Sequence, residues 1–483
     1  MVRPFRVYDT LSGEVRPFVP RVSPRVGLFV CGQTPYAEAH LGHGRNAVTF
    51  DVVARALRRW GYHVFYVQNV TNIDDRLIAR GQGEGRDPLE LAEFHFQGWL
   101  RSMDQLDARA VNLYPFATDY VPEIIAQVSA LIDRGFAYVV DGDVYYEVAK
   151  FPDYGRLSGQ RIEALRPGAR VEPDPKKRAP EDFAVWKSTK PGEPTWPSPW
   201  GPGRPGWHIE DTAITARLLG EQYDIHGGGS DLKFPHHEAE IAQAEGASGE
   251  KPLVNYWMHG GMLQMQGEKM AKSVGNVASL DEGIRKVGPD VLRFFYLNAN
   301  YRSPLNFEPG KSLEEAREGY ATLATPYRHL REELLRGGLT RPGRELPVEV
   351  AKTSTELPIR LDEILAEDFQ TREAIAALFG WGRLLNEWSS KLGALSGAAL
   401  VTLGAPYRWA TEVLGLFPER SSAKAPAEFG ALVQLAIDAR GRARARGDFG
   451  EADQVRQALL QAGIVLEDQG TETRWQWKRD GVG

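Results

Sequence analysis

The sequence contains only one cysteine, Cys31, among its 483 residues. One cysteine forms no intrachain disulfide and builds no cysteine-rich zinc finger or ribbon, so we expect a reducing, cytoplasmic location. Taken alone, a lone cysteine is usually a small buried hydrophobic residue. A functional role for Cys31 would therefore require other functional side chains close to it in the fold.

Long apolar runs are also absent. The longest, such as Val26–Cys31, have the length of a β-strand and fall far short of the roughly 20 residues that a membrane span needs. No apolar run follows Arg3 and Arg6, so a secretory signal is not expected. The sequence predicts a protein that has no membrane partner.

An excess of positive charge is absent as well. The 58 basic and 64 acidic residues give a formal net charge of −6. A protein that holds nucleic acid through bulk positive charge would have the opposite sign, so a nucleic-acid partner requires locally clustered basic residues. The composition is that of a globular protein, and the length suggests about three domains.

Hydrophobic patterns predict an α/β fold in the N-terminal part. Val26–Cys31 is typical of a buried parallel strand, His40–Trp60 has helical spacing, and Tyr62–Val70 alternates like the next strand. Such a unit predicts a parallel sheet with helices on its faces. A further helix is expected over Pro235–Glu245.

The chain past Leu313 is predicted to be helical almost throughout. A basic helix with a following helix and a small hairpin is expected at its end. The helical ranges are Leu313–Leu335, Leu357–Ala366, Thr371–Leu392, Ala405–Leu416, Ala431–Arg446 and Phe449–Ala462, and the hairpin strands are Ile464–Glu467 and Thr473–Lys478.

Two short motifs indicate nucleotide chemistry. His40-Leu-Gly-His43 follows the first strand, where α/β sheets bind ligands and a helix N-terminus offers N–H groups to phosphates. Lys269-Met-Ala-Lys-Ser273 lies between glycines, and its two lysines can neutralise one anion. Taken separately, each motif has a plainer interpretation: surface histidines beside a tight turn, and a solvated charge cluster.

Together, the motifs resemble the signature pair of class I aminoacyl-tRNA synthetases. Further blocks spread over nearly the whole chain resemble the cysteinyl-tRNA synthetase family. These blocks are Phe29–Thr34, Asn69–Asp75, Gly206–Glu210, Ile225–Asp231, Phe234–Glu238, Tyr301–Asn306, Glu367–Ala374 and Asp448–Trp475.

The resemblance implies a fold in several parts: a Rossmann-type doubly wound parallel sheet with an inserted connective domain, then a helical bundle and a small C-terminal α+β domain. The catalytic domain would comprise residues 1–114 and 206–260, with the insertion at 115–205. The lysine motif and a stem-contact region would occupy 261–312, a tRNA-binding bundle 313–418, and an anticodon-binding domain 430–483.

The resemblance also implies an ATP-dependent ligase, which forms cysteinyl-adenylate from Mg²⁺-ATP and transfers cysteine to the 3′ end of a tRNA. The amino acid's own carboxylate is the nucleophile, so catalysis is positioning plus charge stabilisation. The catalytic residues would be His40, His43, Lys269 and Lys272. These four would also bind ATP, with Gly42, Gly228, Gly229, Asp231 and Ser273, and the amino acid would lie among Cys31, Gly32, Thr34, Thr71 and Trp207.

A zinc ion that binds the substrate thiolate is the third implication. Its ligands map onto Cys31, Asp211, His236 and Glu240, and Asp211 stands where the family has a second cysteine. A Zn–thiolate bond would separate cysteine from serine, which small apolar differences do only about 10–200-fold. Aspartate is an acceptable zinc ligand, but it makes Mg²⁺ or Mn²⁺ more competitive. In the remaining alternative no metal binds, and Asp211 only forms hydrogen bonds.

Two more departures from the family pattern lie near the amino-acid pocket, at Gly32-Gln-Thr-Pro-Tyr36 and at Asn72. The first hypothesis is a monomeric cysteine–tRNA ligase. The second is a paralogue that activates another, related small amino acid or uses a non-tRNA acceptor. A non-enzymatic tRNA-binding protein is a third hypothesis, which the presence of both nucleotide motifs disfavours.

Basic and aromatic residues alternate near the C-terminus. Arginines can hold phosphates and aromatic rings can stack on unpaired bases, although a solvated basic helix would show the same pattern. The resemblance places anticodon binding in this region. Arg440, Arg444, Arg474 and Trp475 are therefore predicted to contact tRNA.

Overall fold

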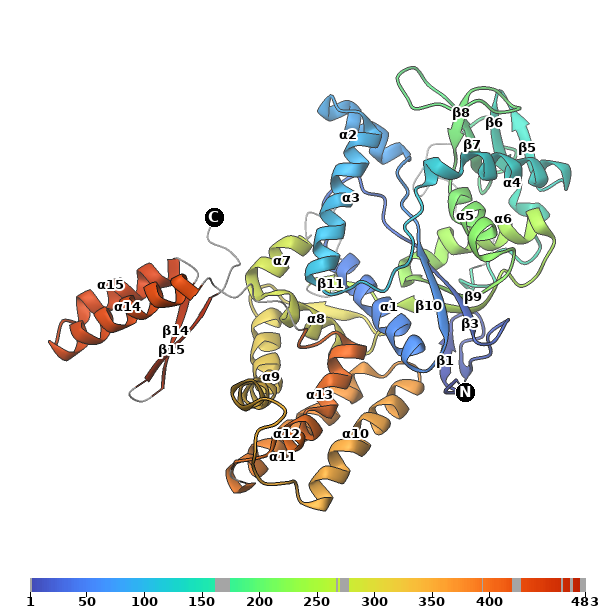
Figure 1. Cartoon of the computed structure of the whole chain (residues 1–483). Helices are drawn as coiled ribbons and strands as arrows, with labels where there is room; N and C mark the ends of the chain where they lie inside the picture. The colour runs from blue at the N-terminus through green and yellow to red at the C-terminus, as the bar shows by residue number, and fades with distance from the viewer. Residues whose placement is uncertain are drawn as a thin grey trace. The chain divides into compact units, whose positions relative to one another are not determined.

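The computed structural model describes residues 2–160, 174–265, 268–269, 278–392, 394–418, 427–461, 464–469 and 472–477 (Figure 1). The chain divides into two compact units, Met1–Phe417 and Pro418–Gly483. Within the described ranges, no helix is long and apolar enough to cross a membrane.

A four-stranded parallel sheet forms the centre of the first unit. Its strands are ordered β10 (Val254–Gly260), β9 (Tyr223–Gly229), β3 (Arg25–Val30) and β4 (His63–Gln68). The carboxyl ends of β3, β4 and β9 meet at one edge, because Val30 lies opposite both Gln68 and Gly227. This edge is where an α/β sheet binds its ligands.

Helix α1 (Leu41–Arg59) follows β3 and packs closely on the sheet. A Cβ at Gly227 would collide with the ring of Phe50, so the glycine of β9 permits this close approach. The strand ranges and the long helix confirm the predicted strand–helix–strand unit.

The chain between β4 and β9 forms several further elements. Helices α2 (Asp75–Glu84) and α3 (Pro88–Gln105) come first, and α5 (Ile209–Leu219) ends the segment. Between them, α4 (Val121–Asp133) accompanies an antiparallel sheet of β5 (Ala137–Val140), β6 (Asp143–Tyr146), β7 (Phe183–Ser188) and β8 (Gly203–Pro205). Figure 1 shows this sheet beside α4, α5 and α6 (Glu238–Ser248).

Shorter strands border the central sheet. A hairpin of β1 (Arg6–Asp9) and β2 (Glu14–Pro17) precedes it in the chain. After it, β11 (Leu263–Met265) pairs with β12 (Glu268–Lys269) and with β13 (Leu305–Phe307).

The remainder of the first unit is mostly helical, which confirms the prediction for the chain past Leu313. Its helices are α7 (Leu280–Val287), α8 (Pro289–Leu297), α9 (Ser312–Gly337), α10 (Val348–Ala366), α11 (Thr371–Leu392), α12 (Gly397–Leu403) and α13 (Ala405–Trp409). Of these, α7, α8 and α12 were not predicted. Three predicted boundaries were wrong. Helix α10 begins well before Leu357 and passes through Pro358, α13 continues as a π-helical turn, and α6 begins at Glu238 after another such turn.

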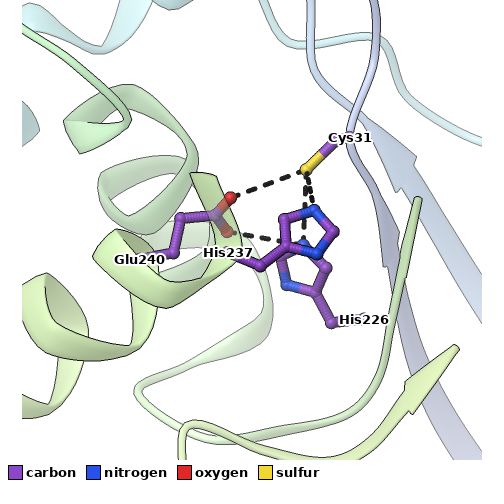
Figure 2. A group of neighbouring side chains, drawn as sticks. All are labelled: Cys31, His226, His237 and Glu240. Atoms are coloured by element: carbon purple, nitrogen blue, oxygen red, sulfur yellow. Dashed lines mark hydrogen bonds and ion pairs between the residues drawn. The ribbon is translucent and has the colours of Figure 1, made fainter. Parts of the chain in front are cut away.

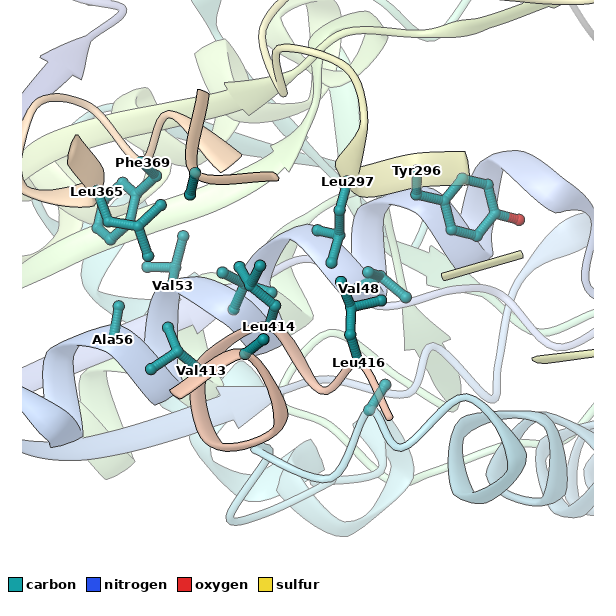
Figure 3. Packing of buried hydrophobic residues seen from close by; sticks show 14 of the residues in the cluster. Val48, Val53, Ala56, Tyr296, Leu297, Leu365, Phe369, Val413, Leu414 and Leu416 are labelled. Atoms are coloured by element: carbon teal, nitrogen blue, oxygen red, sulfur yellow. The ribbon is translucent and has the colours of Figure 1, made fainter. Parts of the chain in front are cut away.

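One hydrophobic core joins α1 to the helical bundle. Val48 and Val53 of α1 contribute to it, with Leu297 of α8 and Leu365 of α10, and Leu414 comes from the turn after α13 (Figure 3). The bundle therefore packs against α1 and fixes its position.

The second unit comprises α14 (Ala427–Ala445), α15 (Phe449–Gln461) and the hairpin of β14 (Ile464–Gln469) and β15 (Glu472–Trp477). These elements confirm the predicted helix–helix–hairpin order. Their small core contains Val433, Ile437, Leu459, Ile464 and Leu466.

Candidate active site and metal centre

The first histidine motif caps helix α1. The Nδ1 atom of His40 accepts hydrogen bonds from the backbone N–H groups of Gly42 (3.1 Å) and His43 (3.4 Å). In return, Nδ1 of His43 accepts the N–H of His40 at 3.3 Å, and the two rings stack with centroids 3.7 Å apart. The pair is thus pre-organised at a helix end that favours anions.

An open cleft begins at this helix end. It brings together most of the predicted nucleotide residues and the end of β3. Among the predicted site residues, Cys31, Gly32, His40, Gly42, His43, Gly229 and Asp231 line it.

Arg45 also lines the cleft, although it was not among the predicted site residues. Its guanidinium donates to the carbonyl oxygens of Gly261 and Ser303, each at 2.7 Å, and burial lowers its pKa to about 10. Arg45 therefore ties α1 to the segments that follow β10 and α8.

The second motif lies mostly outside the described residues. Lys269 belongs to β12, where it pairs with Gln264, and its side chain is not described. Lys272 and Ser273 lie outside the described ranges. Their assignment to ATP stays a prediction.

Four side chains predicted as metal ligands converge beyond the end of β3. His236 Nε2 lies 3.0 Å from Asp211 Oδ2 and 3.1 Å from Glu240 Oε1. Cys31 Sγ lies 3.7 Å from Asp211 Oδ2 and 3.6 Å from Glu240 Oε1. We call Cys31, Asp211, His236 and Glu240 the outer tetrad.

The outer tetrad fits a tetrahedral metal ion. With metal–ligand bonds of about 2.0–2.3 Å, the donor atoms of such a site lie about 3.3–3.6 Å apart, close to the distances seen here. The donors are one sulfur, one nitrogen and carboxylate oxygens, a set that zinc accepts. Burial raises the pKa of the Cys31 thiol and of the Glu240 carboxyl, so a divalent cation would stabilise the ionised forms of both groups.

Further histidines surround the same cysteine. His226 Nε2 lies 3.3 Å and His237 Nε2 3.1 Å from Cys31 Sγ, and both rings are fully buried (Figure 2). Behind them, His259 contacts His237, and Tyr223 contacts His226. None of these four residues was predicted to have a role, and the neighbouring pair His236-His237 was the one available signal in the sequence.

Asp211 is fixed by a polar network. The side-chain amide of Asn69 donates to Asp211 Oδ1 and to the hydroxyl of Thr71 (3.1 Å), while its oxygen accepts the N–H of Gly32 at 2.6 Å. Thr71 in turn donates to Glu210 at 3.3 Å. Gly32 and Thr71 therefore lie beside the outer tetrad.

The other predicted amino-acid and ATP residues lie elsewhere. Trp207 is 48% exposed and lines a separate cleft with Lys187 and Arg204. Thr34 is absent from the residues lining the first cleft in the described part of the chain. Gly228 is buried against His237, where a Cβ would approach the ring to 2.8 Å.

The second unit presents only part of the predicted RNA-binding set. Arg440 is 4% exposed, so this arginine packs inside the unit and is not available to a phosphate. Arg444 is exposed on α14, and Trp475 is half-buried on β15 opposite Leu466. Arg474 belongs to β15, and its side chain is not described.

Comparison with known proteins covers nearly the whole chain. Residues 17–318 match the family described as tRNA synthetases class I (C) catalytic domain. The Cysteine–tRNA ligase of Pelotomaculum thermopropionicum is 42% identical over 97% of this chain and 99% of its own length. That of Trichlorobacter lovleyi is 43% identical over 98% of this chain and 99% of its own.

Solved structures share the fold at low identity. Methionyl-tRNA synthetase of Mycobacterium tuberculosis, bound by methionyl-adenylate, has a TM-score of 0.58 at 14% identity and covers 81% of this chain and 92% of that chain. The LeuRS of Agrobacterium radiobacter has a TM-score of 0.57 at 12% identity and covers 82% of this chain and 84% of that chain. The class I synthetase fold expected from the motifs is confirmed.

Proposed function

The chain belongs to the cysteine–tRNA ligase family, and from this premise we propose how its residues join cysteine to tRNA. A carboxylate oxygen of cysteine attacks the α-phosphorus of ATP, and pyrophosphate leaves. The terminal ribose 2′-OH of the tRNA then attacks the carbonyl carbon of cysteinyl-adenylate, and AMP leaves. Neither step needs a protein nucleophile, so the chain positions the reactants and stabilises charge.

One observation carries the proposal: Cys31 belongs both to the metal cluster and to the cleft that His40 and His43 border. An amino acid whose thiol is held beside Cys31 would have its carboxylate near the phosphate-binding helix end. This arrangement matches the reaction, in which the thiol identifies the substrate and the carboxylate reacts.

The nucleotide half of the cleft would hold Mg²⁺-ATP. The capped N-terminus of α1, with His40 and His43, supports binding of the phosphates because it offers oriented N–H groups. Asp231 and Gly229 line the same cleft on the side of β9, which supports contact with the nucleoside. Lys269, Lys272 and Ser273 would supply positive charge to the leaving pyrophosphate, as their motif implies.

The outer tetrad would hold Zn²⁺. When bound, the ion supplies a soft partner for the substrate thiolate, which a serine hydroxyl cannot match. Cys31, His236 and Glu240 ligate it in this proposal, and Asp211 provides the fourth donor. Gly32 and Thr71 border the space where the amino acid would lie, and Asn69 holds both in place.

The tRNA would engage the second unit through Arg444 of α14 and residues of β15. Arg444 supports contact with phosphates, and Trp475 with an unpaired base. Arg474 remains a candidate from its position in β15. Arg440 is no longer one, because it is buried.

The alternative of a paralogue with another amino acid rests on Asp211 and on the departures from the family pattern at Gly32–Tyr36 and Asn72. Full-length relatives named as cysteine–tRNA ligases at 42–43% identity favour cysteine instead. Amino-acid-dependent pyrophosphate exchange over all twenty amino acids tests both. Cysteine as the only well-used substrate supports the proposal, and efficient exchange with a different amino acid contradicts it.

A variant of the lysine motif tests the nucleotide assignment. Lys272→Ala should reduce the exchange rate by about 10²-fold or more, the scale for a lost transition-state donor. Lys352→Ala, an exposed lysine on α10, is the matched control and should leave the rate unchanged. An unaltered rate in Lys272→Ala would remove that lysine from the mechanism.

A further inference from the structure

Cys31 and Glu240 belong to a second set of potential ligands besides the outer tetrad. Cys31, His226, His237 and Glu240 also lie with their donor atoms within 4.8 Å of one another (Figure 2). All four side chains are buried, whereas His236 of the outer tetrad is 17% exposed. We call this second set the inner tetrad.

The spacing of the inner tetrad suits a tetrahedral ion. Cys31 Sγ is 3.3 Å from His226 Nε2, 3.1 Å from His237 Nε2 and 3.6 Å from Glu240 Oε1. Glu240 Oε2 is 3.4 Å from His226 Nε2. Ligands of one tetrahedral zinc are about 3.3–3.6 Å apart, so little movement is required to close these four around an ion.

Both histidines of the inner tetrad have the second ring nitrogen fixed by a neighbouring side chain, as metal-ligating histidines do. A ligating histidine uses one ring nitrogen for the metal and has the other fixed by a hydrogen bond. His226 Nδ1 is 2.6 Å from the hydroxyl of Tyr223, and His237 Nδ1 is 2.8 Å from His259 Nε2. His259 is itself fixed through Thr10 at 2.8 Å, so each Nε2 is directed at Cys31.

Donor chemistry favours the inner tetrad. Its ligands are one thiolate, one carboxylate and two imidazoles, whereas the outer tetrad has one thiolate, two carboxylates and one imidazole. Imidazole nitrogen suits zinc better than a second hard carboxylate oxygen, which makes Mg²⁺ or Mn²⁺ more competitive. Asp211 is buried beside Cys31 in either case, so its charge does not distinguish the two positions.

We propose that the inner tetrad of Cys31, His226, His237 and Glu240 is an alternative position for a zinc-like divalent cation in this chain. The two tetrads share Cys31 and Glu240, so one ion occupies one position at a time. The inner position compensates for the missing second cysteine, because His226 and His237 take the places of Asp211 and His236 as donors, and Asp211 is the less suitable donor for zinc. The inference rests on the proposed metal site and adds two ligands to it.

The test compares Co²⁺ binding to the metal-stripped, full-length chain and its variants. Co²⁺ binds at tetrahedral zinc sites, and the absorption spectrum of the bound ion shows both whether a thiolate is a ligand and what the coordination geometry is. The outer variant is Asp211→Asn combined with His236→Gln. The inner variant adds His237→Asn, which keeps a polar group near the Nδ1 position but removes Nε2, and His63→Asn on the exposed edge of β4 is the control.

The outer variant should keep about one Co²⁺ per chain, with thiolate-to-cobalt absorption and an affinity within tenfold of the unmodified chain. Addition of His237→Asn should lower the affinity at least 100-fold. If His237→Asn does not fold by circular dichroism, His226→Asn in the outer variant replaces it and should have the same effect.

Loss of Co²⁺ from the outer variant, with binding retained in the unmodified chain, would overturn the inner position and leave the outer tetrad as the metal site. An unmodified chain that binds no Co²⁺ would overturn both metal positions. Cysteine-dependent pyrophosphate exchange, measured on the same protein, reports separately whether the ligase function stands.

Discussion

The side-chain amide of Asn69 holds the carboxylate of Asp211. The same amide group accepts the backbone N–H of Gly32, the residue after Cys31, at 2.6 Å. One side chain from the loop after β4 thus connects two parts of the proposed metal centre that lie far apart in the sequence. Asp211 is 1% exposed, so its orientation depends on such partners.

Replacement of this amide should weaken metal binding without removing a ligand. Asn69→Ala frees the carboxylate of Asp211 and the N–H of Gly32, which adjoins Cys31, a ligand of both tetrads. Since the inner tetrad does not use Asp211, we expect a loss of metal affinity at the lower end of the usual range for such supporting hydrogen bonds, about tenfold. Competition with a chelator measures the zinc affinity. Asn298→Ala, at the exposed end of α8, is the control, and equal affinities in the two variants would mean that Asn69 has no part in the site.

A second cysteine at the outer tetrad should strengthen it. Asp211→Cys replaces a hard oxygen by a soft sulfur, so zinc affinity should rise about tenfold or more while Mg²⁺ and Mn²⁺ compete less. Chelator competition and Co²⁺ absorption check this, the latter by a stronger thiolate-to-cobalt band. The control is Asp211→Asn, which keeps the size but not the charge. A zinc affinity no higher than that of the unmodified chain would contradict the prediction.

Local patterns were sufficient to find part of this site. Cys31 could be placed at the end of a buried strand, and His236 and Glu240 share a helical face because they are four residues apart. Their convergence with Asp211 follows from the resemblance to a family. His226 had no local signal, since it reaches Cys31 only through the pairing of β9 with β3, more than 190 residues apart in the chain.

Other errors have equally local causes. The predicted helix Leu357–Ala366 starts too late, since α10 begins at Val348 and continues through Pro358, where a proline would ordinarily mark a helix start. Arg440 was grouped with its arginine neighbours, since helical spacing alone does not show which face the β14–β15 hairpin covers. Its contact with Thr473 of that hairpin, at 3.5 Å, explains why the structure buries it.

Asp75 should stabilise the chain in a pH-dependent way. Burial raises the pKa of this carboxyl, but Lys187 (2.5 Å) and Arg204 (2.6 Å) outweigh that effect and hold the pKa below its ordinary value of 3.8. A carboxyl whose pKa is lowered by folding stabilises the folded chain at pH values above its ordinary pKa. This stabilisation is lost as the pH falls through the lowered pKa. Since Asp75 is half-exposed, we expect about 1 kcal/mol.

Urea unfolding of Asp75→Asn at two pH values measures this contribution. The variant should be less stable than the unmodified chain at pH 7, and the difference should shrink towards zero below about pH 3. Asp104→Asn, which removes an exposed carboxylate paired with Arg109, is the control and should have little effect at either pH. A difference that stays constant with pH would show that charge is not its origin.

The His40 side chain caps α1 and is proposed to bind a phosphate of ATP, and one pair of variants separates these two roles. As the cap of α1 it accepts two backbone N–H groups, so His40→Ala should cost about 0.5–2 kcal/mol of stability. As a phosphate ligand it should also contribute about 10²-fold to adenylate formation, the scale of one donor to a developing charge.

Ser396→Ala removes a comparable cap from α12, far from the cleft, where Ser396 accepts the N–H of Ala399 at 3.1 Å. Thermal unfolding should show similar losses in both variants, whereas pyrophosphate exchange should fall only in His40→Ala. Equal exchange rates in the two variants would reduce His40 to a capping residue.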